Sequence, residues 1–235
     1  MTATGSPADR PIVLLHGFGS NTDALWRKFG WVEALEDKGR VVIGIDLPGH
    51  GTSKDISHSD PVDLLFDEAD KRGPVDAVGF SAGAWALLAA AGERPALFHR
   101  IAVIGAGDMV LTQGMHTPAM QRPMVEALRS TTEPVDNPMA TAILALIADA
   151  GNDRNAVADY LTTEKHFPTV EDLARITATT LVVESNADAA GPSDLIARTI
   201  PHTERFIVDG ADHFELPTRA ECKTTVMSFL NAESR

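Results

Sequence analysis

The chain has 235 residues, a length that fits one large domain or one domain with an insertion. Acidic residues outnumber basic ones by 33 to 20, and the resulting net charge of -13 makes nucleic acid and anionic membrane surfaces unexpected partners. The single cysteine excludes an internal disulfide framework, and no apolar run approaches the length of a membrane span. These features predict a cytoplasmic globular protein.

Short apolar segments alternate with longer segments of helical character along most of the chain. The short segments are rich in Val and Ile, which is typical of strands that are buried on both faces of a parallel sheet. Parallel strands need crossover connections, and the helical segments supply them, so the pattern predicts an α/β domain with a mostly parallel sheet. The expected strands are residues 12–15, 41–45, 75–79, 101–104, 181–183 and 206–208, and the expected crossover helices are residues 61–71, 82–91, 193–199 and 217–230.

Residues 108–175 break this alternation because they contain no convincing strand. Prolines and a Gly-Asn turn signal separate three expected helices in this stretch. An all-helical block between two strands of one sheet predicts a lid. The chain is therefore expected to divide into a core of residues 1–107 and 176–235 and a helical cap of residues 108–175, with cap helices at residues 120–130, 139–150 and 155–164.

The strongest chemical signal is the pentapeptide GFSAG at residues 79–83, which follows an apolar strand directly and opens an Ala-rich helix. In this context the pattern G-x-S-x-G predicts a sharp strand-to-helix turn with Ser81 at its apex. The glycines two positions before and after the serine relieve the clashes that side chains would cause there. Ser81 is therefore the candidate nucleophile; the alternative interpretation is a glycine-bounded turn with an incidental serine.

A serine hydroxyl is a poor nucleophile until a base takes its proton, so a histidine and an orienting acid are expected nearby. His213 is the candidate base, because none of the other seven histidines follows the last expected strand. Asp188 is the candidate acid because it follows the fifth expected strand, and Asp108, after the fourth, is its rival. The chain order Ser81, Asp188, His213 is the order typical of a G-x-S-x-G nucleophile.

Two backbone N–H groups are the candidate oxyanion donors. The helix that begins at Ala82 aims its first N–H groups and the positive end of its dipole at a negative charge developing beside the serine. The sequence HGFG closes the first expected strand, and the N–H of Phe18 in it is the candidate second donor. His16 and His50 lie in glycine turns, where a structural hydrogen-bonding role is expected.

Taken together, these motifs resemble the α/β-hydrolase superfamily, and the resemblance runs from about residue 11 to residue 230. It rests on HGFG, DLPGHGTS, GFSAG, a late aspartate and GADHF, which occur in this order. The resemblance implies a catalytic triad, an oxyanion hole and a cap. Only about ten residues precede the HGFG strand, where family members usually carry two further strands, so a shortened sheet of about six strands is expected. The residues implied are Ser81, Asp188 and His213 for the triad, Phe18 and Ala82 for the oxyanion hole, and 108–175 for the cap.

Methionine and aromatic residues near these motifs and in the first half of the cap are expected to line a substrate pocket. Methionine adapts to irregular apolar surfaces, which favours an apolar acyl or alcohol pocket, although packing of the cap onto the core would use the same residues. No arginine or lysine has a sequence position that requires contact with a substrate carboxylate, and Arg122 and Lys165 in the cap are the candidates for such a contact. The candidate pocket residues are Trp26, Phe80, Met109, Met120, Met124 and Phe214, with Phe18 and Trp85 as further aromatic candidates.

The favoured function is hydrolysis of a small, mainly apolar carboxylic ester through an acyl-enzyme. Hydrolysis of a carbon–carbon bond, lactone opening or a lyase reaction on the same triad is an alternative, because fold and triad are shared among these reactions. A small-molecule receptor or signalling protein is an alternative of a different class, since HGFG followed seven residues later by Trp26 is similar to that branch of the family. No metal and no cofactor is expected. The expected partner is a small-molecule substrate, and the sequence does not distinguish a monomer from a homodimer.

Overall fold

A computed structural model describes residues 10–53, 60–112, 117–131 and 137–232, and its central element is one six-stranded sheet. The strand order is β2-β1-β3-β4-β5-β6, and every neighbouring pair is parallel. The predicted α/β class and six-stranded sheet are therefore confirmed. The strands are β1 (Ile12–Leu15), β2 (Val42–Ile45), β3 (Val75–Phe80), β4 (Phe98–Ile104), β5 (Thr179–Ser185) and β6 (Thr203–Val208).

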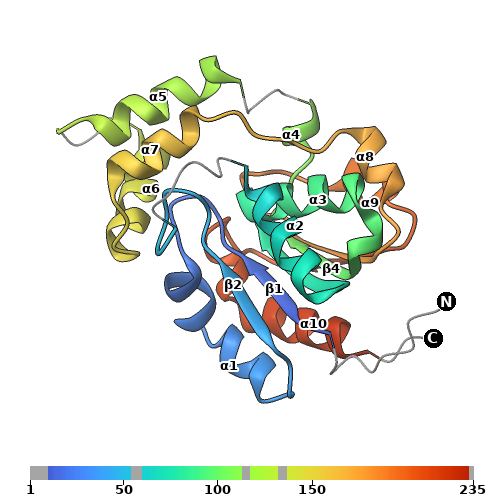
Figure 1. The fold of residues 1–235 in the computed structure, drawn as a ribbon. Coiled ribbons are helices and arrows are strands. Elements are labelled where there is room, and N and C mark those ends of the chain that lie inside the picture. Colours follow the sequence, from blue (N-terminus) through green and yellow to red (C-terminus); the bar gives the residue numbers. More distant parts are fainter. Residues whose placement is uncertain (1–9, 54–59, 113–116, 132–136, 233–235) are drawn as a thin grey trace.

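Helices cover both faces of the sheet (Figure 1). Alternate residues of β1 point to opposite faces, so that Val13 and Leu15 enter one core while Ile12 and Leu14 enter the other. The first face is covered by α2 (Pro61–Arg72), α3 (Ala82–Glu93), α8 (Val170–Arg175) and α9 (Asp194–Thr199), and the second by η2 (Thr22–Arg27), α1 (Trp31–Glu36) and α10 (Ala220–Asn231).

Three strands extend further toward their amino ends than the sequence predicts. The added residues include Arg100 in β4, Thr180 in β5 and Glu204 in β6, whose polar side chains interrupt the apolar pattern. Arg100 donates hydrogen bonds to the carbonyls of Phe229 and Ala232. Such tertiary partners allow polar residues to lie in a strand. A pattern of apolar residues does not predict these strand positions.

The described residues between β4 and β5 form helices joined by loops, and none of them belongs to a strand. Three of these helices agree with the expected cap helices to within two residues at each end. They share an apolar cluster of their own and lie beyond the carboxyl ends of the strands in Figure 1, whereas Leu173 of α8 joins the core beside α3. The helices are α4 (Met109–Thr112), α5 (Pro118–Arg129), α6 (Pro138–Asp149), α7 (Arg154–Thr162) and α8, and we refer to residues 108–175 as the helical insertion.

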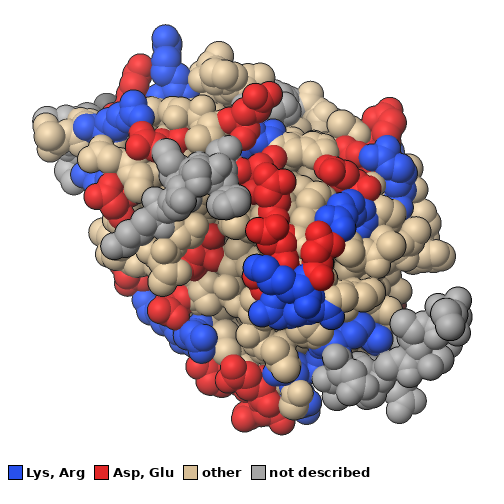
Figure 2. All heavy atoms as spheres, in the orientation of Figure 1, with Lys and Arg blue, Asp and Glu red and all other residues tan. Residues whose placement is uncertain are grey.

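The surface carries charges of both signs. Acidic and basic side chains are interspersed on the face shown in Figure 2, with uncharged surface between them. Within the described ranges, no helix is long and apolar enough to cross a bilayer.

Candidate active site

The chain reverses its position in the sheet between β1 and β3. It passes from β1 outward to β2, returns to β3 on the other side of β1, and then continues outward to β6. In open parallel sheets, ligands bind at the carboxyl ends of the strands beside such a reversal. Phe18 follows β1 and Ser81 follows β3, so both residues lie at this point.

Ser81 has a backbone conformation that is unusual for a residue with a side chain. Its φ is 53°, and no other non-glycine residue among those described has a positive φ. A non-glycine residue costs about 1–3 kcal/mol in such a region, and this cost is tolerated where the surroundings fix the conformation. The Ser81 N–H donates a hydrogen bond to the carbonyl of Ile104 at 2.9 Å, which ties the turn to β4.

The two glycines that flank Ser81 are required by close approach of the backbone. A Cβ at Gly79 would lie 2.5 Å from the carbonyl oxygen of Gly83. A Cβ at Gly83 would lie 2.6 Å from the carbonyl oxygens of both Leu15 and His16. Real side chains essentially never make such contacts, so glycine at these positions allows α3 to start directly over the end of β1.

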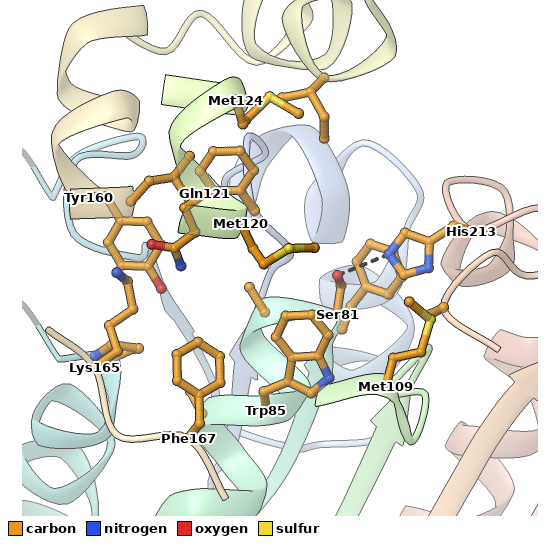
Figure 3. A pocket seen from close by; sticks show the side chains of 18 of the residues that line it. Ser81, Trp85, Met109, Met120, Gln121, Met124, Tyr160, Lys165, Phe167 and His213 are labelled. Carbon is orange, nitrogen blue, oxygen red and sulfur yellow. Dashed lines mark hydrogen bonds between the residues drawn. The ribbon is translucent and has the colours of Figure 1, made fainter. Parts of the chain in front are cut away.

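Ser81, His213 and Asp188 form a continuous chain of hydrogen bonds (Figure 3 shows the first). The Ser81 hydroxyl donates to His213 Nε2 at 2.9 Å, and His213 Nδ1 donates to the Asp188 carboxylate at 2.8 and 3.0 Å. The carboxylate can only accept, so it fixes the imidazole tautomer that leaves Nε2 free to accept from the serine. Asp188 itself is buried and also accepts a hydrogen bond from the Ala190 N–H at 2.7 Å. The structure thus brings together the three residues expected from the sequence.

The rival acid, Asp108, has a different set of partners. Its carboxylate accepts hydrogen bonds from the N–H groups of Leu195 and Ile196 at 2.7 and 3.0 Å. Both donors belong to the first turn of α9, so Asp108 acts as a cap for that helix. His213 is hydrogen-bonded to Asp188 and not to Asp108.

The N–H groups of Phe18 and Ala82 both flank Ser81 and are available to a ligand. Both residues line the cavity described below. No described residue accepts a hydrogen bond from either N–H group. Two uncommitted donors from different loops beside one hydroxyl are the arrangement that stabilises an oxyanion.

Two buried histidines hold the loops around these donors. His50 Nε2 accepts a hydrogen bond from the Gly19 N–H at 3.0 Å, and its Nδ1 donates to the Pro48 carbonyl at 3.0 Å. His16 Nε2 accepts from the Leu47 N–H at 3.0 Å. Burial lowers the pKa of His50 to about 3 and lowers that of His16, so both rings are neutral at pH 7 and can accept these hydrogen bonds.

Asn152, just after α6, links the helical insertion to the same loops. Its amide donates to the carbonyls of Gly19 and Ser20 at 2.9 Å, and its side-chain oxygen accepts from the Gly51 N–H at 2.8 Å. The sequence marks this residue only as part of a turn. Its positioning role depends on how the insertion packs on the sheet, and no local pattern indicates it.

A cavity of about 300 Å³ lies over Ser81, between the carboxyl edge of the sheet and the helical insertion. Its size is that of a site for a small ligand. Most of its wall is apolar, and Met109, Met120 and Met124 from the insertion contribute to it (Figure 3). The expected pocket residues that line it are Phe18, Phe80, Trp85, Met109, Met120, Met124 and Phe214.

Comparison with known protein families identifies the fold. The model of the alpha/beta hydrolase family matches residues 12–222, which is most of the chain. The chain belongs to the alpha/beta hydrolase family. This confirms the resemblance seen in the sequence motifs and makes the protein an enzyme of the hydrolase class. No curated protein matches the sequence.

Solved structures of alpha/beta hydrolases share this fold at low identity. MenH from S. aureus is 17% identical, with a TM-score of 0.75 over 97% of this chain and 95% of that chain. An esterase (EaEST) from Exiguobacterium antarcticum is 17% identical, with a TM-score of 0.73 over 95% of this chain and 92% of that chain. The putative non-heme bromoperoxidase BpoC from Mycobacterium tuberculosis H37Rv is 16% identical, with a TM-score of 0.71 over 96% of this chain and 93% of that chain. At these identities the likeness shows the fold alone.

One expected pocket residue of this hydrolase lies elsewhere. Trp26 does not line the cavity; its side chain is fully buried and packs edge to face against Trp31 with the ring centroids 5.1 Å apart. The prediction is wrong because η2 turns Trp26 into the core between the sheet and α1, although the residue is close to HGFG in the sequence.

Part of the cavity wall comes from residues that no sequence motif indicates as pocket residues. Tyr160 of α7 and Gln121 of α5 line the cavity, as do Phe167 and Lys165 from the segment that follows α7. Tyr160 stacks on Phe18 with the ring centroids 6.3 Å apart, which couples the insertion to the loop after β1. These residues reach the cavity because elements that are distant in the sequence pack together. In the sequence itself, only their aromatic or polar character within a helical block indicates a role in the cavity wall.

The described part of the chain contains no group of three His, Cys, Asp or Glu side chains arranged to hold a metal ion. The one cysteine, Cys222, is buried on α10 in the core, where burial raises the pKa of its thiol to about 12. A thiol with so high a pKa stays protonated at pH 7 and is a poor nucleophile.

Proposed function

We propose that this protein is a serine hydrolase that cleaves a small, mainly apolar carboxylic ester through an acyl-enzyme. Ser81 acts as the nucleophile, His213 as general base and acid, and Asp188 as the acid that orients the imidazole. The N–H groups of Phe18 and Ala82 stabilise the oxyanion. The helical insertion of residues 108–175 acts as the cap that encloses the substrate over the core formed by residues 1–107 and 176–235.

The observation that carries this proposal is the hydrogen-bonded chain from Ser81 to Asp188 at the base of an apolar cavity. In the first half of the reaction, Ser81 Oγ bonds to the carbonyl carbon while its proton moves to His213 Nε2. The carbonyl electron pair moves to the oxygen, whose negative charge the two N–H groups stabilise. The tetrahedral intermediate then expels the alcohol, which takes the proton from His213, and the acyl group stays on Ser81.

Water completes the reaction from the same position. It loses a proton to His213 Nε2 as its oxygen bonds to the acyl carbon, and the second tetrahedral intermediate forms. When this intermediate collapses, the bond to Ser81 Oγ breaks and Oγ recovers the proton from His213. The carboxylic acid leaves and the starting hydrogen bonds are restored. Asp188 stabilises the imidazolium in both halves without taking its proton.

A fluorophosphonate probe and a series of 4-nitrophenyl esters test this function. The intact protein is expected to be labelled at Ser81 and to hydrolyse esters with short and medium acyl chains, with rates that fall once the chain exceeds the cavity of about 300 Å³. Ser81→Ala is expected to abolish labelling and to lower kcat by about 10⁴-fold or more. Ser228→Ala, which changes an exposed serine on α10, is the matched control and should change neither result.

Three outcomes would contradict the proposal in different ways. Full esterase activity in Ser81→Ala would show that another residue is the nucleophile. Turnover of vinylogous diketones far above that of every ester would replace ester cleavage by carbon–carbon bond hydrolysis on the same triad. If Ser81 resisted the probe and the protein bound a small molecule stoichiometrically, a receptor function would replace the proposed enzymatic function.

A further inference from the structure

A lysine ammonium group lies in the otherwise apolar wall of the cavity. Lys165 follows α7, lines the cavity and is half-buried. Figure 3 shows its side chain beside Tyr160 and Gln121, across the cavity from Ser81 and His213. The cavity therefore has the proposed nucleophile at one end and a cation at the other.

The ammonium group has few partners of its own. Lys165 Nζ donates one hydrogen bond, to the Thr163 carbonyl at 2.8 Å, and lies 4.4 Å from the centroid of the Tyr160 ring. No described carboxylate forms an ion pair with it. An ammonium group can donate three hydrogen bonds, so two of its N–H groups are not committed to described residues. An unpaired charge in an apolar wall is costly, and an anionic ligand would offset that cost.

Two neutral polar groups complete this end of the cavity. Tyr160 and Gln121 both line it, and neither the Tyr160 hydroxyl nor the Gln121 side-chain amide forms a hydrogen bond with a described residue. Both groups can donate to an oxygen atom. Together with Lys165 they provide donors for the two oxygens of one carboxylate.

Arg122, the other candidate cation that the sequence indicates in the insertion, lines a neighbouring hollow that it shares with Lys165 and Gln121. Its side chain on α5 is 78% exposed, lies 3.7 Å from Glu126 and does not line the cavity over Ser81. The site therefore offers one unpaired positive charge, which matches a single carboxylate better than a dianionic phosphate. The apolar wall between the two ends fits a hydrocarbon segment of the same ligand.

We propose that Lys165 binds a carboxylate at the far end of the substrate, so that the preferred substrate is an ester that also carries a free carboxylate, separated from the ester group by an apolar chain. The inference rests on the proposed function, whose substrate class it specifies. Lys165 is the residue that determines this specificity, and Tyr160 and Gln121 support it with hydrogen bonds.

The burial of Lys165 adds a pH signature. Burial lowers the pKa of its ammonium group to about 8, while the charge of Asp60 at the start of α2 acts in the opposite direction. The ammonium group is charged below pH 8 and loses its charge above it, so the preference for a carboxylate is expected to fall as the pH rises through 8. Other titratable groups around the cavity are Tyr160, His166, which pairs with Glu93 of α3, and His213.

A matched pair of substrates isolates the contribution of the carboxylate. Mono-4-nitrophenyl suberate carries the carboxylate, and its methyl ester replaces that charge with a neutral ester group at the same end of an equally long chain; release of 4-nitrophenol reports cleavage at the same bond in both. The ratio of kcat/KM for the two substrates is expected to fall about tenfold or more in Lys165→Met, mainly through KM, and to be largely kept in Lys165→Arg. Arg122→Met removes the same charge from an exposed position and should leave the ratio unchanged.

The pH profile of this ratio is the second readout. In the wild-type protein the ratio should decline above pH 8, whereas in Lys165→Arg it should stay level, because an arginine keeps its charge. Both proteins contain the other titratable groups around the cavity, Tyr160, His166, Asp60 and His213. A difference between the two pH profiles is therefore caused by the side chain at position 165. Equal profiles would contradict the proposal.

A binding measurement separates the inference from the proposed function. In the Ser81→Ala background, calorimetric affinity for the uncleaved suberate monoester should fall about tenfold on addition of Lys165→Met and stay constant on addition of Arg122→Met. The inference alone would be overturned if Ser81 were labelled and neutral esters were cleaved, but Lys165→Met changed neither the ratio of kcat/KM for the two substrates nor the affinity for the monoester. If the protein hydrolysed no ester but its binding of the monoester still depended on Lys165, the proposed ester hydrolysis would be overturned and the carboxylate-binding site would stand.

Discussion

The loops at the carboxyl edge of the sheet and the helices α5–α7 form opposite walls of one cavity, but they are built differently. On the sheet side, His16, His50 and Asp188 are buried and hydrogen-bonded, and Gly83 allows contact at distances that a Cβ would forbid. On the helical side, Met120 and Met139 are 60% and 47% exposed while also lining the cavity. Groups that must hold one geometry lie on the rigid side, and adaptable side chains lie on the other.

The largest expected effect is on the rigid side, at the orienting acid. Asp188→Asn keeps the size of the side chain but favours the wrong imidazole tautomer, so kcat is expected to fall by about 10⁴-fold with little change in KM. Asp108→Asn is the control, because an asparagine still caps α9 and does not contact His213, and its kcat should equal that of the wild type. Ester hydrolysis under saturating substrate gives both values; equal losses in the two variants would remove the distinction between the acids.

A smaller loss is expected at the glycines. Gly83→Ala forces α3 away from the end of β1, which should cost about 2–3 kcal/mol of unfolding free energy and about 100-fold in kcat as Ser81 moves. Gly151→Ala in the insertion is the control: its φ is 66°, but a Cβ there meets no atom within 4 Å. That variant should lose about 1 kcal/mol and keep its activity, as measured by urea denaturation and ester hydrolysis.

The neutral histidines predict an acid sensitivity of the rigid side. Because burial lowers the pKa of His50 to about 3, the unfolded chain takes up a proton at this residue near pH 6.5 while the folded chain does not. Stability is therefore present above pH 6.5 and is lost as the pH falls toward 3, by at most about 1.4 kcal/mol per pH unit for this one group. His50→Gln, whose carbonyl can still accept from Gly19, should reduce the slope of unfolding free energy between pH 6.5 and 4.5; an unchanged slope would exclude His50 as its source.

The smallest effect is expected on the adaptable side. Met120→Ala removes a mostly exposed side chain, so the unfolding free energy should change by less than about 0.5 kcal/mol. The same variant should raise KM a few-fold for medium-chain esters and leave acetyl esters unaffected, because only longer chains reach α5. Val41→Ala, which shortens a 62% exposed side chain outside the cavity wall, is the control. A stability loss of several kcal/mol at Met120 would show that the two walls are built alike.

The sequence predicts the rigid side better than the adaptable side, for a physical reason. Ser81 follows β3 directly and His213 lies in the loop after β6. The carboxyl ends of parallel strands meet at one edge, so strand positions alone bring these residues to the same edge. Asp108 and Asp188 both satisfy that rule, and the structure separates them by placing Asp108 at the start of α9 and Asp188 beside His213. This difference depends on tertiary packing, which the local sequence does not encode.

The cavity wall from the insertion was predicted only in part. The character of the methionines in the insertion indicates a cavity wall, and Met109, Met120 and Met124 do line the cavity. Lys165 and Asn152 depend on how helices dock over the sheet edge, which no periodicity encodes. Trp26 shows the converse, since nearness to a motif along the chain does not give nearness to the site.

The partners in the Ser81–His213 hydrogen bond are 132 residues apart in the chain, and those in the Asn152–Gly19 hydrogen bond are 133 apart. Contacts of such long sequence separation form late in folding, after most of the loop-closure entropy has been lost. A nascent chain that ends before β6 has the serine and its strained turn but no base for it. Under the proposed mechanism, hydrolytic activity is thus a reporter of complete folding, and a growing chain on the ribosome carries an inert Ser81 until its last strand and helix are in place.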